Sequence, residues 1–197
     1  MNHFECFKNA RKVIIEMLSD RGFTVNDEYK DIDEETLKYI YFIKSYDIVC
    51  KKNTDNSQIY VKFIYINKIK PSVLKEYITA LYKDILNNDD KIILILQEKP
   101  TNTILKIAEQ HDCELFDINN LQINITKHRL VPAHTLASDE EVADIMDKYN
   151  LRAIQQLPIL LKSDPIVRYY NYPSNKVCKI TRISETAVES VFYRYIR

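Results

Sequence analysis

The stretch Lys91-Ile92-Ile93-Leu94-Ile95-Leu96 is short and almost uniformly apolar. A run of this length and composition is typical of a strand that is buried on both faces of a sheet. A helical pattern that opens at Pro71 precedes it, and a second one, over residues 103–110, follows it. This alternation of strand and helix predicts an α/β layer over residues 45–125.

The segments around this run extend the layer. Apolar residues recur at helical spacing over residues 4–18, and we expect that helix to end at Asp20-Arg21-Gly22, where glycine can adopt the left-handed conformation. A second helix is expected after the acidic residues 31–34. Extended segments are predicted at residues 46–50, 58–65, 114–116 and 121–125, the first two as a hairpin.

The residues that follow a junction at 126–128 predict a second, compact domain. Ser138 and Glu141 have the spacing of a capping box ahead of a helical apolar stripe. Asp164-Pro165 is typical of a helix cap followed by a proline in the first turn. Alternating polarity over residues 176–183 and 190–196 predicts two strands. We therefore expect two strands and two short helices here.

The composition disfavours several classes of function. The 197 residues carry no formal net charge, which argues against a protein that holds nucleic acid alone through a dense basic surface. One glycine, Gly22, cannot supply the glycine-rich loops that cradle phosphates. We expect a soluble intracellular protein without a cofactor, because neither a signal peptide nor a membrane-spanning run is recognisable. Reduced thiols, rather than a zinc site or disulfides, are expected at the widely spaced Cys6, Cys50, Cys113 and Cys178.

An ordered series of short motifs fills the chain from residue 128 onward. The motifs are His128-Arg129-Leu130-Val131-Pro132-Ala133-His134, Gln156-Leu157-Pro158, Ser163-Asp164-Pro165 with Arg168-Tyr169, Lys179-Ile180-x-Arg182-x-Ser184-Glu185-Thr186-Ala187, and Tyr193-Arg194. At these spacings the series resembles one family closely. Its members are the fifth-largest subunit of eukaryotic DNA-directed RNA polymerase and a shorter archaeal counterpart.

The resemblance continues toward the N-terminus and is weakest in the middle of the chain. Glu16-Met17-Leu18-x-Asp20-Arg21-Gly22-Phe23 is similar to the end of the family's first helix. Ile123-Asn124-Ile125-Thr126-x-His128 is similar to the family's junction between domains. The chain therefore resembles the eukaryotic and viral two-domain form, since the archaeal form consists of the C-terminal domain alone.

This resemblance implies a fold and a role. The expected fold is an α/β N-terminal jaw domain, a mixed sheet with flanking helices over residues 1–126, followed by a small α+β C-terminal assembly domain over residues 127–197. The expected role is that of a non-catalytic subunit of a multi-subunit DNA-directed RNA polymerase. Its partners would be the largest subunit, neighbouring small subunits and downstream duplex DNA, with no membrane and no small-molecule substrate. The expected location is the nucleus if the gene is cellular, or the host cytoplasm and the virion if it is viral.

Two groups of contact residues follow from the resemblance. The assembly surface is expected to draw on His128, Val131, Pro132, His134, Leu157, Pro158, Asp164, Pro165, Arg168, Tyr169, Lys179, Arg182, Ser184, Glu185, Thr186, Tyr193 and Arg194. The DNA contact is expected at Lys99, Thr101, Asn102, Thr103 and Lys106. The second group follows a buried strand and opens a helix, and a helix N-terminus is a favourable place for a phosphate. The alternative for this segment is an ordinary polar loop with a threonine cap.

The chain departs from the family pattern at several turns. Asn171 and Asn175 stand where glycine is usual, and asparagine tolerates positive φ well. Val188 also replaces a glycine, but a β-branched residue resists positive φ, so we expect either an extended residue or a rebuilt loop there. Ile183 replaces a common proline. These departures favour a divergent member of the family, and we expect a virus that encodes its own polymerase as the source.

Two other functions compete with the subunit. A free-standing adaptor that recruits polymerase would share the same surface. A metal-dependent nuclease would need an acid two residues before a lysine on a strand, but Val61-Lys62-Phe63 lacks that acid and Gln97-Glu98-Lys99 has the wrong spacing. His128 and His134 lack further ligands for a metal site. Clustered aspartates for a polymerase active centre are missing too, so we expect the catalytic residues on another chain.

Overall fold

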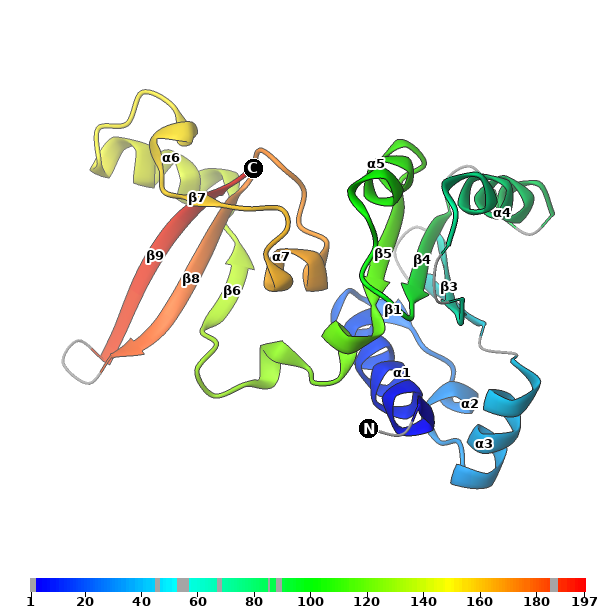
Figure 1. The fold of residues 1–197 in the computed structure, drawn as a ribbon. Coiled ribbons are helices and arrows are strands. Elements are labelled where there is room, and N and C mark those ends of the chain that lie inside the picture. The colour runs from blue at the N-terminus through cyan, green and yellow to red at the C-terminus, as the bar shows by residue number, and fades with distance from the viewer. Residues whose placement is uncertain are drawn as a thin grey trace. The chain divides into compact units, whose positions relative to one another are not determined.

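The computed structural model describes residues 3–44, 47–52, 57–66, 69–84, 86–87, 90–184 and 188–197, with the backbone alone at Asp84 and Ser184. The chain divides into two compact units, Met1–Ile123 and Asn124–Arg197 (Figure 1). The junction predicted after residue 126 falls in a short 3-10 turn, η2 (Ile125–Lys127), at the start of the second unit. The predicted fold class, in which an α/β domain is followed by a smaller domain of sheet and helices, is confirmed.

The N-terminal unit is built on a five-stranded mixed sheet of order β1-β2-β3-β4-β5. Pairing is antiparallel from β1 to β3 and parallel from β3 to β5. The elements are α1 (His3–Asp20), β1 (Phe23–Thr24), α2 (Asp27–Lys30), α3 (Glu34–Ile43), β2 (Ile48–Lys52), β3 (Gln58–Ile64), α4 (Pro71–Asp84), β4 (Lys91–Leu96), α5 (Asn102–Gln110), β5 (Cys113–Asp117) and η1 (Ile118–Leu121). The predicted hairpin strands are confirmed as β2 and β3, while its turn, residues 53–56, lies outside the described residues.

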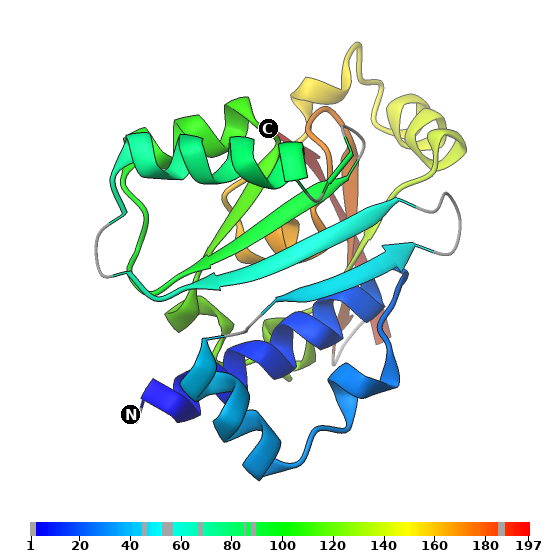
Figure 2. The ribbon, with the colours of Figure 1, turned by 90° about the vertical axis from the view of Figure 1, so that its right-hand side faces the viewer.

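Helices cover both faces of this sheet (Figure 2). The connecting helices α4 and α5 lie on one face, where Leu74, Ile78 and Ile104 are buried. Helix α1 covers the other face, and its Phe7 meets Phe63 of β3 edge to face, with ring centroids 5.1 Å apart. Between these layers, every residue of β4 from Ile92 to Leu96 is at most 3% exposed. The predicted strand with two buried faces is therefore confirmed.

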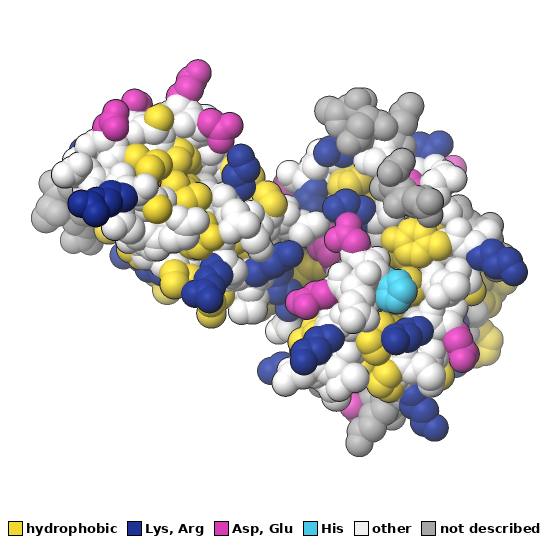
Figure 3. Space-filling model, turned by 90° about the horizontal axis from the view of Figure 1, so that it is seen from above, with side chains coloured by type: hydrophobic (Ala, Val, Ile, Leu, Met, Phe, Trp, Pro, Cys, Tyr) yellow, Lys and Arg dark blue, Asp and Glu magenta, His cyan; other side chains and the backbone are white. Residues whose placement is uncertain are grey.

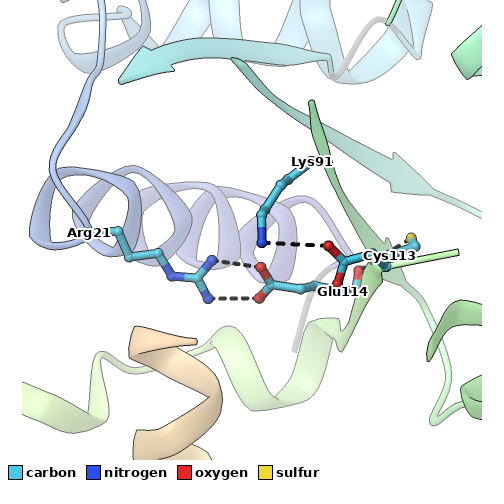
Figure 4. A network of polar contacts seen from close by, with 5 residues as sticks. Arg21, Lys91, Cys113 and Glu114 are labelled. Atoms are coloured by element: carbon cyan, nitrogen blue, oxygen red, sulfur yellow. Dashed lines mark hydrogen bonds and ion pairs between the residues drawn. The ribbon is translucent and has the colours of Figure 1, made fainter. Parts of the chain in front are cut away.

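A largely buried ion pair joins the end of the first helix to β5, an edge strand of the sheet. Helix α1 ends at Asp20 as predicted, and Gly22 follows with φ of 83°. Arg21 between them donates from its two terminal nitrogens to the two carboxylate oxygens of Glu114 on β5, at 2.9 and 2.8 Å (Figure 4). The two side chains are only 6% and 18% exposed. This pair holds together segments that are 93 residues apart in sequence.

Residues 121–125 do not form the strand predicted for them. They connect the two 3-10 turns, η1 and η2. The Asp117 side chain accepts a hydrogen bond at 2.9 Å from the backbone N–H two residues later, and Asn124 Oδ1 does the same at 3.0 Å. Such bonds from a side chain to the nearby backbone compete with strand pairing. The prediction was wrong because it weighed the apolar alternation and not these two turn-forming side chains.

The C-terminal unit holds a four-stranded sheet of order β6-β8-β9-β7. Its further elements are β6 (Ala133–Leu136), α6 (Asp139–Lys148), η3 (Ile154–Gln156), β7 (Ile159–Leu160), α7 (Pro165–Tyr170), β8 (Val177–Ser184) and β9 (Val188–Ile196). The antiparallel pair β8 and β9 confirms the two predicted strands. The short outer strands β6 and β7 were not predicted, so the expectation of two strands was incomplete.

Both predicted helix starts of this unit are confirmed. The Ser138 hydroxyl accepts from the Glu141 N–H, and the Glu141 carboxylate accepts from the Ser138 N–H, both at 3.1 Å. Asp164 caps α7 by accepting from the Ile166 N–H at 2.9 Å, with Pro165 in the first turn. Helix α6 packs on one face of the sheet and α7 on the other.

Three turn positions test the departures from the family pattern. Asn171 and Asn175 adopt φ of 51° and 65°, as expected for asparagine in place of glycine. Val188 adopts φ of 57°, so it is not the extended residue that we allowed for. Its side chain is 79% exposed, so no neighbour crowds it and the strain is confined to its own backbone.

Among the described residues, no helix is long and apolar enough to cross a membrane.

Candidate functional site

The two faces of the C-terminal sheet carry different sets of predicted contact residues. Directly paired residues on adjacent strands share a face. Lys179 is paired with Tyr193 on the face that α6 covers. His134 lies on the opposite face, because it is paired with Ile180, which packs in the core under α7. The predicted assembly residues therefore do not form one continuous patch.

Several of the predicted assembly residues hold the fold. Leu157 is 9% exposed and packs in the core beneath α6, and Tyr169 is 3% exposed. The Tyr169 hydroxyl accepts a hydrogen bond from the amide of buried Asn124 at 3.1 Å, which ties α7 to the start of this unit. Lys179 donates to Glu141 at 2.6 Å and so fastens β8 to α6. This bond raises the pKa of the Lys179 ammonium and lowers that of the Glu141 carboxyl.

Other predicted assembly residues are available to a partner. Those that are exposed are His128, Pro158, Pro165, Arg182 and Arg194. Those that are half-buried are Val131, Pro132, His134, Asp164, Arg168 and Tyr193. Glu185, Thr186 and the side chain of Ser184 lie outside the described residues. The exposed arginines Arg182 of β8 and Arg194 of β9 share a face of the sheet. Ile180 and Phe192 are a cross-strand pair and share a face, and each arginine lies two residues further along the same strand as one of them.

The two histidines of the first motif are bound to the backbone. Leu130 N–H donates to His128 Nδ1 at 3.2 Å. His134 Nδ1 lies 2.7 Å from the Pro132 carbonyl oxygen, and since a carbonyl only accepts, Nδ1 carries the proton. Within the described part of the chain, no group of three or more His, Cys, Asp and Glu residues could hold a metal ion. Cys50, Cys113 and Cys178 are buried free thiols, and Cys6 is a half-buried one.

The predicted DNA-contacting segment lies at the start of α5. Thr101 is the N-cap residue by its backbone angles, but its side chain makes no cap hydrogen bond. Lys99, Thr101, Asn102, Thr103 and Lys106 are all exposed. The first turn of a helix leaves backbone N–H groups without intrahelical partners, and these attract anions. The threonine is thus a cap in position only, and its hydroxyl is open to solvent.

One buried polar cluster was missed by the sequence analysis. Asp47 accepts hydrogen bonds from the Tyr60 hydroxyl at 2.5 Å and from the Lys62 ammonium at 2.8 Å. Burial and the Asp47 contact together raise the pKa of Tyr60. Lys62 is one of the residues that we considered for a nuclease site. It forms an ion pair with Asp47 within the fold, and Asp47 belongs to no group of three or more His, Cys, Asp and Glu residues, among those described, that could hold a metal ion.

A second missed feature is a groove beside β9 in the C-terminal unit. It has a volume of about 310 Å³ and is lined by Tyr149, Leu151, Gln156, Leu157, Pro158, Val191, Phe192 and Tyr193. Tyr149, at 54% exposed, and Phe192, at 51% exposed, are the most open aromatic side chains around it. The sequence signal that could have indicated it is the predicted helical stripe ending at Tyr149, which leaves an apolar residue beyond the core.

Comparison with known proteins places this two-unit chain in a family. Residues 123–196 match the model of the C-terminal domain of RNA polymerase Rpb5. Subunit 5B of DNA-directed RNA polymerases IV and V of Arabidopsis thaliana is 32% identical, over 98% of this chain and 91% of that protein. The chain belongs to the Rpb5 family. The resemblance predicted from the motifs is therefore confirmed, and it extends over the N-terminal unit.

Other members of the Rpb5 family show the same extent of similarity. Subunit rpabc1 of RNA polymerases I, II and III of Dictyostelium discoideum is 30% identical over 93% of each chain. Subunit RPABC1 of the same three polymerases of Caenorhabditis elegans is 29% identical over 94% of this chain and 93% of that protein. These relatives span both units, so the likeness is not confined to the matched C-terminal domain.

Proposed function

We propose that the chain is a non-catalytic subunit of a multi-subunit DNA-directed RNA polymerase. The observation that supports this most strongly is the likeness to polymerase subunits over nearly the whole chain. A protein that kept only the C-terminal domain for another purpose would not need an N-terminal unit of the same family. The proposal assigns catalysis to other chains.

In this proposal the C-terminal unit docks on the largest subunit. The supporting feature is the pair of exposed arginines on one face of β8 and β9, Arg182 and Arg194. Arg194 also donates to the Ile159 carbonyl at 3.3 Å, which holds it at this face. An exposed guanidinium is suited to bidentate pairing with a partner carboxylate, which gives orientation as well as affinity. Leu157, Tyr169 and Lys179 contribute indirectly, because they hold the docking surface in place.

The docking residue Arg182 can be separated from a general charge effect by a matched pair of variants. We expect Arg182→Glu to reduce recovery of the largest subunit with the tagged chain by about tenfold, since it replaces one attractive charge pair by a repulsive one. Lys162→Glu is the control, because Lys162 is an exposed cation of the same unit outside the proposed surface. Equal recovery with both variants would refute the assignment of Arg182, provided that both melt like the wild type.

The proposal also gives the N-terminal unit a contact with downstream DNA at the start of α5. The support is the exposure of the two cations and three polar residues there, together with the open helix start. Each phosphate contact that is lost lowers the magnitude of the slope of log K against log salt by about 0.9. We expect Lys99→Ala with Lys106→Ala to lower that slope for the purified polymerase by about 1 to 2. Lys83→Ala, an exposed lysine of α4, is the control, and an unchanged slope in the double variant would contradict the DNA contact.

A further inference from the structure

The outer edge of β9 is only partly covered. Its inner edge pairs with β8 along the length of both strands. On its outer edge, β7 pairs only with Tyr195 and Ile196. In the part of the chain that the structure describes, the stretch of β9 from Glu189 to Tyr193 has no strand partner on that side. A row of unpaired backbone groups of this kind is a template for an additional strand.

The direction of the backbone groups follows from the covered end of the strand. Tyr195 N–H donates outward to the Pro158 carbonyl, whereas Ile196 N–H donates inward to the Lys176 carbonyl, both at 2.9 Å. Because this direction alternates along a strand, the N–H and C=O groups of Val191 and Tyr193 point outward as well. The free stretch of five residues is about 17 Å long, which is enough for a short added strand.

The missed groove runs along this free edge. Val191, Phe192 and Tyr193 form one of its walls. A second hollow of about 260 Å³ continues it along α6 and shares Tyr149 and Tyr193 with it. A strand added along β9 would place every second side chain against the apolar and aromatic residues that line the groove.

The helix beside the second hollow is acidic. Helix α6 carries five acidic residues and one basic residue, Lys148. Glu141, Asp144 and Lys148 line the second hollow, and Glu141 is paired with Lys179. Glu189 of β9 is exposed at the free edge. Figure 3 shows apolar side chains gathered on the face of the C-terminal unit, with acidic side chains along one margin. This charge complements a partner segment that bears lysine or arginine.

We infer that β9 receives an extended, alternately apolar and basic segment of the large polymerase subunit, which adds as a strand along Glu189–Tyr193. The inference rests on the proposed function, because it specifies how the C-terminal unit docks. Backbone hydrogen bonds from Val191 and Tyr193 supply affinity that does not depend on sequence. The groove, the acidic residues of α6 and Glu189 select the side chains of the segment.

Proline substitutions test the added strand directly. Val191→Pro removes an outward N–H and leaves the β8–β9 hydrogen bonds intact, and proline is tolerated in strands at such positions. The matched control is Ile183→Pro on the opposite edge of the same hairpin. The Val177 carbonyl points away from β9, because it accepts from the Ala137 N–H. The direction of the backbone groups alternates along the strand, and Ile183 is an even number of residues from Val177, so the Ile183 N–H also points away from β9. A second control, Val191→Ala, shortens the side chain but keeps the N–H group.

The assay is co-purification of the large polymerase subunits with the tagged chain from its native cells. We expect Val191→Pro to lower their recovery about tenfold and Ile183→Pro to change it little. Val191→Ala should lower recovery less than Val191→Pro, because it loses only side-chain contacts and keeps the backbone N–H. If Val191→Pro recovers as much as the wild type, the added strand is refuted while the proposed function stands. If the wild type recovers no polymerase subunits, the proposed function itself fails.

Hydrogen exchange keeps the test decisive if a proline variant does not fold. The wild-type chain is compared free and within the purified polymerase, and exchange is followed at the amides of Val191 and Tyr193. We expect rapid exchange in the free chain and strong protection in the complex, because an added strand would accept both hydrogen bonds. Equal exchange in the two states would overturn the inference.

Discussion

Replacing Arg21 by methionine should destabilise the N-terminal unit strongly. Arg21 lies in one of the short stretches that carry the family resemblance, and the structure assigns it a role within the fold. It makes two hydrogen bonds to Glu114, at 2.9 and 2.8 Å, and its side chain is only 6% exposed. Methionine keeps most of the apolar contacts of the arginine stem but leaves the Glu114 carboxylate with its charged partner removed.

The magnitude follows from this burial. Removing one partner of a buried ion pair costs about 3 to 5 kcal/mol, and we take the lower end because Glu114 keeps 18% of its side-chain exposure. A loss of about 3 kcal/mol corresponds to a fall in Tm of about 10 °C for a unit of this size. Most of this cost comes from leaving a largely buried carboxylate without its arginine, so the double variant with Glu114→Leu should recover about half of it or more.

The assay is urea unfolding of the full chain, followed by circular dichroism and by labelling of the Cys113 thiol. Cys113 is buried beside Glu114 on β5, so its labelling reports the opening of this unit. The four chains of a double-mutant cycle are compared at one pH. A cost for Arg21→Met below about 1 kcal/mol, or additive costs of the two substitutions, would refute the reasoning.

Three further outcomes are expected. Val188→Gly should stabilise the C-terminal unit by about 1 kcal/mol in urea unfolding, because φ of 57° costs a β-branched residue more than glycine loses in entropy. The control Val188→Ala should gain little. A loss of stability with glycine would contradict the claim that Val188 is strained. Ser138→Ala should cost about 1 kcal/mol of that unit's stability, whereas Ser138→Asp retains the cap; an equal loss in both would show that the hydroxyl is unimportant. Burial raises the pKa of the Cys113 thiol from 9.0 to about 12. The unfolded chain therefore releases this proton first, and the free energy of unfolding should fall as the pH rises from about 9 to about 12. An identical dependence of the unfolding free energy on pH in Cys113→Ala would contradict this.

The sequence predicted correctly the strands, helix starts and turns that are determined by residues close to them in the chain. The apolar run from Lys91 to Leu96 forms the interior strand β4, whose residues Ile92 to Leu96 are buried under helices on both faces of the sheet. The capping residues Ser138 and Asp164 begin α6 and α7 as expected, since an N-cap needs only the next few backbone N–H groups. The asparagines at the two turns adopt the left-handed conformation for the same local reason.

The elements that were missed depend on partners distant in sequence. β7 has only two residues, and it is a strand because it pairs with β9. The paired residues, Ile159 and Tyr195, lie far apart in the sequence. β6 pairs with β8 in the same way, Ala133 with Thr181. The strand predicted at residues 121–125 failed for the opposite reason, because local side-chain bonds outweighed an apolar pattern.

The contact residues were predictable as a group but not in their individual roles. The motifs indicated the family, and the comparisons confirm it. Sequence spacing could not show that Tyr169 is bonded inside the fold while Arg182 is open to solvent, because that depends on how helix α7 and strand β8 are oriented in the folded unit. The groove beside β9 could not be predicted either, since its lining comes from the residues that follow α6, from the end of η3 and the residues after it, and from the last strand.

The most direct test of the central claim is affinity purification of the tagged chain from its native cells, followed by mass spectrometry and a transcription assay on the eluate. We expect both large polymerase subunits in amounts equal to the tagged chain, together with RNA synthesis. Recovery of the tagged chain without either large subunit would contradict it.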